Sequence, residues 1–130
     1  MVQQIRTDRA PAPAGAYSQG MLVNGLLFTA GMGPVDPATG ELVGGDVEEQ
    51  TVLVLRNLDE VLRAGGSSLD RVVKVTVHLA DLADFAAFDR TYRRLMTEPY
   101  PVRTTVGSAL AAGMLVEIDC VAAVEGDRTA

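Results

Sequence analysis

The order of elements along this 130-residue chain predicts an α+β fold, in which a single β-sheet carries two helices on one face. Three observations predict it. An Asn-Gly pair joins two apolar runs in the manner of a β-hairpin, hydrophobic residues recur at helical spacing in two segments, and β-branched runs lie between and after those segments. The length fits one domain, residues 1–130, with room for a hydrophobic core.

The N-terminal third predicts strands separated by ordered loops. Residues 2–6 form a short first strand, and the proline-containing segment 10–16 is an ordered loop, because proline fixes φ and removes a backbone donor. Residues 20–30 form the hairpin around Asn24-Gly25, and a short extended piece follows at residues 41–43.

The first helix begins at Asp46, a residue type suited to the N-cap, and ends at Gly65-Gly66. Its apolar residues recur at helical spacing; they are Val47, Val54, Leu55, Leu58, Val61 and Leu62. Asp81 and Asp84 begin a second helix, which carries Phe85, Phe88, Tyr92 and Leu95 and ends before Pro99 and Pro101.

Three strands complete the sheet, at residues 70–79, 102–107 and 115–121. On the first of them His78 faces away from Val77 and Leu79. The last two carry one charge each, Arg103 and Glu117, and we expect them to be adjacent strands. The tail after Val124 is polar and is expected to fray.

Several of these strands are apolar on both faces, as in Leu26-Leu27-Phe28, Val72-Val73 and Leu115-Val116. Two helices on one face leave the other face of the sheet uncovered. A small soluble protein does not normally expose so much apolar surface, so we expect subunits to associate through that face.

The composition is that of a soluble globular protein, with 48% hydrophobic and 22% charged residues. The net charge of −6 argues against a nucleic-acid partner, and Arg90, Arg93 and Arg94 are expected to form a solvated face. Cys120 is the single cysteine and is expected to be buried and inert. With neither a signal peptide nor a membrane span expected, we predict a cytoplasmic protein.

The chain resembles the Rid family (reactive intermediate deaminases, YjgF-type). The resemblance rests on short motifs in the same order and spacing along nearly the whole chain: Gly15-Ala16-Tyr17-Ser18-Gln19, Leu27-Phe28-Thr29-Ala30-Gly31, Asp36-Pro37-Ala38-Thr39-Gly40, Gln50-Thr51 with Asn57-Leu58, Val72-Val73-Lys74-Val75-Thr76-Val77, Asp84-Phe85-Ala86, and Pro101-Val102-Arg103 with Val116-Glu117-Ile118.

The resemblance implies a chorismate-mutase-like α+β fold and a homotrimer, whose three sheets form an inner β-barrel with active sites at the subunit interfaces. It also implies hydrolysis of enamine and imine intermediates, such as 2-aminoacrylate and 2-iminopropanoate, to 2-keto acids and ammonia. It implies neither a cofactor nor a metal, and a 2-imino or 2-keto acid as the ligand.

The family's catalytic positions fall on Arg103 and Glu117. Arg103 matches the arginine that holds the substrate carboxylate; the alternative is a surface arginine in an ordinary ion pair. Glu117 matches the acidic residue near the attacking water; the alternative is an outward strand residue or the partner of an arginine. Tyr17 matches the pocket tyrosine, or else it packs the proline-rich loop.

The wall of the implied pocket departs from the family's usual pattern. Ala30 and Met32 flank Gly31, where a serine and a glutamine are common, and Thr105 stands where some members carry cysteine. Asp89 stands where many carry asparagine, and it would weaken the binding of an anion unless it is paired with Arg90, Arg93 or a neighbouring subunit. These departures indicate a divergent subfamily with a possible shift of substrate.

Two other functions stay open at this point. One is a non-catalytic, small-molecule-binding or regulatory trimer of the same fold. The other is an RNA-cleaving role, which the net charge of −6 disfavours. His78 is the only histidine, so no Ser-His-Asp set can be argued.

Overall fold

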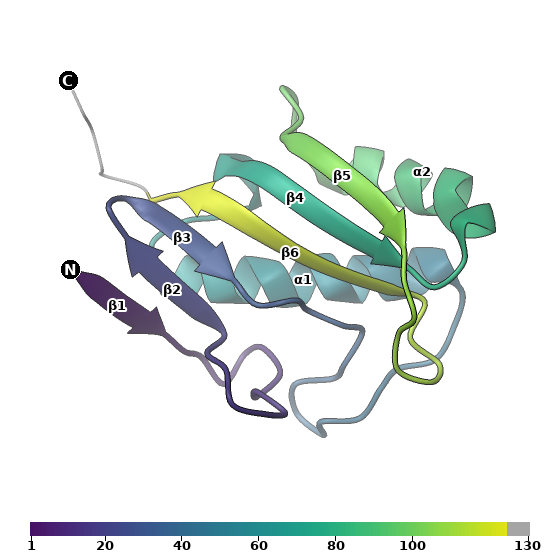
Figure 1. The fold of residues 1–130 in the computed structure, drawn as a ribbon, viewed down its shortest axis with the longest axis horizontal. Coiled ribbons are helices and arrows are strands. Elements are labelled where there is room, and N and C mark those ends of the chain that lie inside the picture. The colour runs from purple at the N-terminus through teal and green to yellow at the C-terminus, as the bar shows by residue number, and fades with distance from the viewer. Residues whose placement is uncertain (125–130) are drawn as a thin grey trace.

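The computed structural model describes residues 1–124, so the expectation for the tail after Val124 lies outside the described residues. One six-stranded mixed sheet has the spatial order β1-β2-β3-β6-β4-β5. The strands are β1 (Val2–Ile5), β2 (Gly20–Val23), β3 (Leu26–Thr29), β4 (Val72–Leu79), β5 (Val102–Gly107) and β6 (Val116–Ala123). Among the strands of residues 1–124, only β4 and β5 are paired in parallel (Figure 1).

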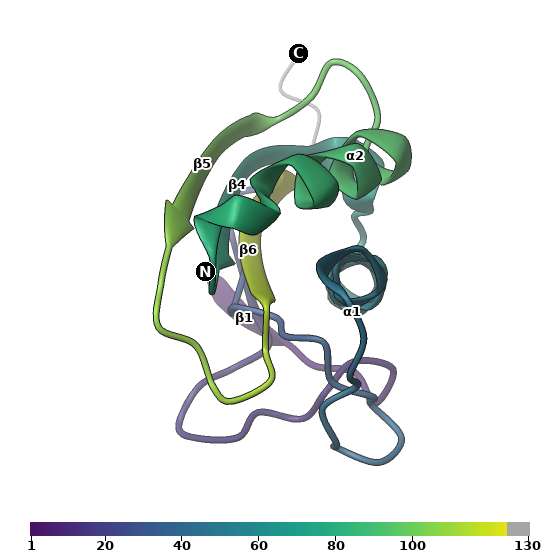
Figure 2. The same ribbon diagram turned by 90° about the vertical axis from the view of Figure 1, so that its right-hand side faces the viewer.

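Both helices, α1 (Val47–Ala64) and α2 (Phe85–Leu95), lie on the same face of the sheet (Figure 2). The predicted α+β architecture is therefore confirmed. Within residues 1–124, no helix is both long and apolar enough to cross a membrane.

Local sequence signals account for the ends of these elements. Asn24 and Gly25 both have positive φ, 50° and 76°, which is the backbone of a tight hairpin turn. Asp46 accepts from the Glu49 N–H and the Glu49 side chain reaches back to Asp46, which forms a capping box at the start of α1. Gly66, with φ of 87°, follows the C-cap of α1.

The structure corrects two details of the expected strands. The strand expected at 70–79 begins at Val72, because residues 69–71 form a 3₁₀ turn in which the Arg71 N–H bonds the Ser68 carbonyl. The strands of Arg103 and Glu117 are not adjacent, because β4 lies between β5 and β6 and pairs with both. β4 and β5 can be parallel neighbours because α2 connects them as a crossover.

The core lies between the sheet and the helices. All six apolar residues predicted on α1 are buried there, together with Val75 and Val77 of β4. Cys120 is also buried, as predicted, and burial raises the pKa of its thiol to about 12.

The opposite face of the sheet keeps large apolar side chains in contact with solvent. Phe28 is 43% exposed, Val73 47% and Val102 68%. This uncovered face is the one from which subunit association was inferred.

Candidate functional site

Side-chain alternation places the two predicted catalytic residues on opposite faces of the sheet. Arg103 shares a register position with Val75, whose side chain is buried toward the helices. Glu117 lies between the buried residues Val116 and Ile118 on β6, so its side chain points to the open face, level with His78 of β4. A single chain therefore does not bring Arg103 and Glu117 together.

Arg103 forms a cluster with Asp89, called here the arginine cluster, and the alternation of β5 places Thr105 on the same face of the sheet. The Arg103 Nη1 donates to Asp89 Oδ1 at 2.8 Å, and both side chains are about four-fifths buried, at 20% and 22% exposure. The bond from Arg103 holds the pKa of Asp89 below its usual value, against the opposing effect of burial.

Three aromatic rings of α2 support the Arg103 guanidinium. Its Cζ lies 4.6 Å from the ring centre of Tyr92, 5.4 Å from that of Phe88 and 5.5 Å from that of Phe85. Such contacts favour a cation and fix the plane of the guanidinium. The sequence indicated these three residues only as one apolar side of a helix, so their contact with Arg103 was missed.

A small cavity opens beside the arginine cluster. It has a volume of about 200 Å³ and is lined by Asp89, Tyr92, Arg93, Tyr100, Pro101 and Arg103. Since a water molecule takes up about 30 Å³ in the liquid, a ligand of a few heavy atoms fits it. Thr105 Oγ1 is buried, and it has no hydrogen-bond partner in the described part of the chain.

The remaining predicted site residues, Tyr17, Ala30, Gly31 and Glu117, form a second group called here the glutamate cluster. A Cβ built on Gly31 would lie 2.6 Å from Glu117 Oε2, so the absence of a side chain at Gly31 makes room for that carboxylate. Tyr17 and Ala30 line a shared open hollow of about 460 Å³.

The Tyr17 side chain is half exposed, and its hydroxyl accepts from the Ala14 N–H at 3.0 Å within its own loop. The two readings of Tyr17 from the sequence are thus compatible: the hydroxyl fastens the proline-rich loop, and one side of the residue remains accessible from the hollow.

Three buried amide side chains hold the loops of the site. Gln19 binds residues 7–11: its Nε2 donates to the Thr7, Ala10 and Pro11 carbonyls, and its Oε1 accepts from the Thr7 N–H. Gln50 bonds Gly113 and Leu115 in the loop before β6, and Asn57 bonds the Gly33 and Val35 carbonyls after β3. All three stood in the quoted motifs, but their role needed the tertiary structure.

We expect Gln19→Ala to loosen the loop that carries Tyr17. The substitution removes four hydrogen bonds to buried or half-buried backbone groups, at about 1 kcal/mol each, so we expect a loss of roughly 2–4 kcal/mol of unfolding free energy. Urea unfolding and limited proteolysis within residues 7–17 measure the effect. Gln3→Ala, at an exposed position of β1, is the control; equal behaviour of the two variants would contradict the assignment.

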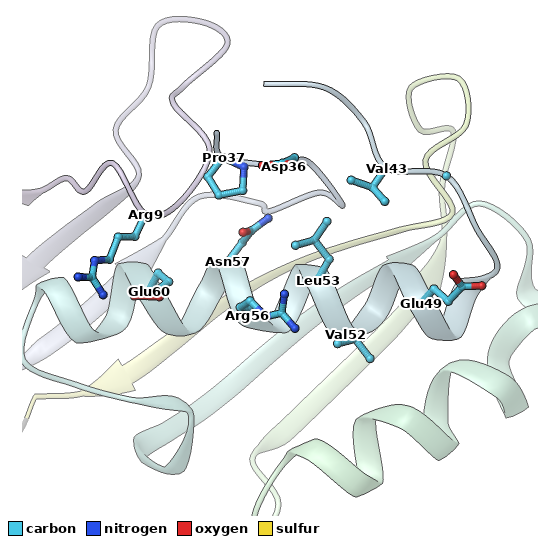
Figure 3. A pocket seen from close by; sticks show the side chains of 11 residues that line it. Arg9, Asp36, Pro37, Val43, Glu49, Val52, Leu53, Arg56, Asn57 and Glu60 are labelled. Carbon is cyan, nitrogen blue, oxygen red and sulfur yellow. The ribbon is translucent and has the colours of Figure 1, made fainter. Parts of the chain in front are cut away.

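A larger cavity lies away from both clusters. It has about 640 Å³ and runs along α1 beneath the loop that contains Asp36 and Val43, with Arg56 and Asn57 on its floor (Figure 3). No predicted site residue lines it. The chemistry of the arginine and glutamate clusters, rather than size, therefore marks the candidate site. Among the described residues, no three His, Cys, Asp or Glu side chains are grouped to hold a metal ion.

Comparison with known proteins agrees with the architecture. The model of the family described as Endoribonuclease L-PSP matches residues 7–124. The chain belongs to this family. A RutC family protein of Pyrococcus abyssi is 44% identical over 119 residues, which cover 91% of this chain and 94% of that protein.

Two further relatives carry names that differ in function. The chloroplastic Reactive Intermediate Deaminase A of Arabidopsis thaliana is 41% identical over 119 residues, which cover 91% of this chain and 64% of that protein. A Lactococcus lactis protein named as a regulator, AldR, is 39% identical over 122 residues, which cover 93% of this chain and 97% of that protein. The resemblance to the Rid family is confirmed.

Two solved structures of family members superpose closely on this chain. RidA from an Antarctic Psychrobacter has a TM-score of 0.89 at 39% identity and covers 94% of this chain and 99% of its own. Escherichia coli TdcF, solved with bound serine, has a TM-score of 0.86 at 36% identity, with 93% and 98% covered.

Proposed function

We propose that this Rid-type chain hydrolyses small 2-imino acids, and their enamine tautomers, to 2-keto acids and ammonia. The observation that carries the proposal is the Arg103 guanidinium, fixed by Asp89 and three rings beside a cavity of about 200 Å³. The Nη1 atom bonds Asp89, which leaves Nη2 and Nε to receive a substrate carboxylate in a bidentate pair.

The reaction requires only that the substrate and a water molecule are positioned and that one group transfers a proton. An enamine such as 2-aminoacrylate first takes a proton on its terminal carbon and loses one from its nitrogen, which gives the imine. Water then adds to the C=N carbon, and the resulting carbinolamine loses ammonia to give the 2-keto acid. Glu117 is the group we assign to orient the water and to pass its proton to the departing nitrogen.

Because the arginine and glutamate clusters face opposite sides of the sheet, we propose that each complete site forms between two subunits. One subunit supplies Arg103, Asp89 and Thr105, and its neighbour supplies Tyr17, Ala30, Gly31 and Glu117. Closure of three open sheet faces around an inner barrel would also cover Phe28, Val73 and Val102. A homotrimer is the assembly that we propose, with a cytoplasmic location.

The direct test generates an imine in place with an amino-acid oxidase and follows its disappearance with and without the protein. We expect faster loss of the imine and matching release of 2-keto acid. The protein has no effect on the imine if the proposal is wrong. A protein that binds 2-keto acids without accelerating imine loss would instead fit a regulatory role, which the name of the Lactococcus relative favours.

Mixed subunits test the shared site. Arg103→Ala and Glu117→Gln subunits are each expected to be inactive alone. In a trimer reassembled from equal amounts, one interface in four combines an intact Arg103 with an intact Glu117, so about a quarter of the wild-type activity should return. No recovery in mixtures shown to exchange subunits would place both residues in one subunit's site.

A further inference from the structure

Asp89 lies between two arginines and bonds each with a different oxygen. Its Oδ1 accepts from Arg103 Nη1 at 2.8 Å, and its Oδ2 accepts from Arg93 Nη2 at 3.0 Å. Asp89 and Arg93 are one turn apart on α2, whereas Arg103 comes from β5. All three side chains line the same cavity of about 200 Å³.

The charges of Asp89, Arg93 and Arg103, called here the trio, decide which anions the cavity can bind. An ionised Asp89 alone would cancel the charge of Arg103 and leave little attraction for a carboxylate. Arg93 adds a second positive charge on the other carboxylate oxygen, so the trio keeps a net charge of +1. One substrate carboxylate balances that charge, whereas two would exceed it.

We propose that Arg93 is a positioning residue that sets specificity: it engages Asp89 so that Arg103 stays available to the carboxylate of a 2-imino monocarboxylic acid. This inference rests on the proposed function. It concerns a residue that the sequence placed on a solvated face and offered as one possible partner of Asp89. The Arg93 side chain is 67% exposed and bonds Asp89.

The alternative is an ordinary ion pair along the helix surface. Pairs of opposite charge four residues apart commonly support a helix without any part in binding. A merely structural pair predicts that loss of Arg93 acts on stability and leaves the affinity for a ligand at Arg103 unchanged. The two readings therefore differ in whether loss of Arg93 changes the affinity for a ligand at Arg103.

A double-mutant cycle separates them. Wild type, Arg93→Ala, Asp89→Asn and the double variant are compared for the dissociation constant of 2-oxobutanoate and for KM and kcat of the matching imine. We expect Arg93→Ala to raise the dissociation constant and KM about three- to five-fold, with kcat within about two-fold. Asp89→Asn keeps an oxygen that accepts from Arg103 and should bind at least as tightly as wild type.

The decisive arm is the double variant. Once Asp89 is neutral, Arg93 has no charge to offset, so Arg93→Ala should then change the dissociation constant by less than about two-fold. Arg93→Lys should restore most of the affinity, because it returns the charge. Arg94→Ala removes an equal charge one residue away, and Arg94 forms no ion pair within residues 1–124; it is the matched control.

The preference for a monocarboxylate over a dicarboxylate tests the substrate class separately. Wild type should prefer 2-oxobutanoate to the dicarboxylate 2-oxoglutarate, and Asp89→Asn, with a net charge of +2 in the trio, should narrow that preference. Equal effects of Arg93→Ala and Arg94→Ala, or an effect of Arg93→Ala that persists in the Asp89→Asn background, would overturn the inference alone. Wild-type protein with neither binding nor turnover would overturn the proposed function together with it.

Discussion

Arg103→Ala is expected to lower kcat/KM for imine hydrolysis by roughly 10²- to 10⁴-fold, which corresponds to about 3–5 kcal/mol of lost transition-state stabilisation. The guanidinium is the group that holds the substrate carboxylate, and its position depends on Asp89 and on the rings of α2. Alanine removes the charge and the bidentate donors together. The coupled amino-acid-oxidase assay, read at several imine concentrations, measures the loss.

Two comparisons make this result specific. Arg103→Lys keeps a positive charge but offers no planar fork, so it should recover only a small part of the activity. Arg94→Ala, an exposed arginine on α2, should stay within about two-fold of wild type. Full activity of Arg103→Ala, in protein with a wild-type circular dichroism spectrum and thermal midpoint, would contradict the assignment of Arg103.

Glu117→Gln is expected to lower kcat by about 10²- to 10³-fold while leaving the affinity for a 2-keto acid nearly unchanged. Glutamine has the shape of glutamate but cannot accept a proton from the attacking water. Single-turnover assays measure the chemical step, and calorimetric titration with 2-oxobutanoate measures binding. A variant that binds weakly but turns over normally would show that Glu117 serves binding rather than chemistry.

Gly31→Ala disturbs the same Glu117 carboxylate without removing it. Its added Cβ would lie 2.6 Å from Glu117 Oε2, 3.0 Å from Cδ and 3.2 Å from Cγ, so the carboxylate end of that side chain must move to relieve the contact. We therefore expect the carboxylate to shift and kcat to fall, with little change in stability. Asp119→Asn is the control, because Asp119 lies two residues further on the same face of β6 and is absent from both clusters.

The parts of the fold that depend on residues adjacent in the sequence were predictable. The N-cap at Asp46, the glycines that end α1 and the Asn24-Gly25 turn each follow from the conformational preference of one or two residues. The position of β4 between β5 and β6 was not predictable in this way. It depends on how α2 crosses over the sheet, and no short stretch of sequence encodes that choice.

The same limit applies to the candidate site. The alternation of residues along β6 shows that Glu117 faces away from Ile118, and the alternation along β5 sets Arg103 apart from Val102 in the same manner. Which face of β5 matches which face of β6 depends on the strand between them. The resemblance could therefore name both residues, whereas their placement on opposite faces needed the structure.

The placement of Arg103 and Glu117 on opposite faces of the sheet also has a consequence for inheritance. If every site takes its arginine from one subunit and its glutamate from the next, a chain damaged only at Arg103 still supplies an intact Glu117 to its neighbour's site. In a cell that makes both a normal and a damaged copy, each normal chain would then complete one working site in a mixed trimer, as many as the normal chains alone would provide. Variants at Arg103 or Glu117 that fold and assemble would accordingly behave as recessive, and two copies damaged at different residues would partly complement each other.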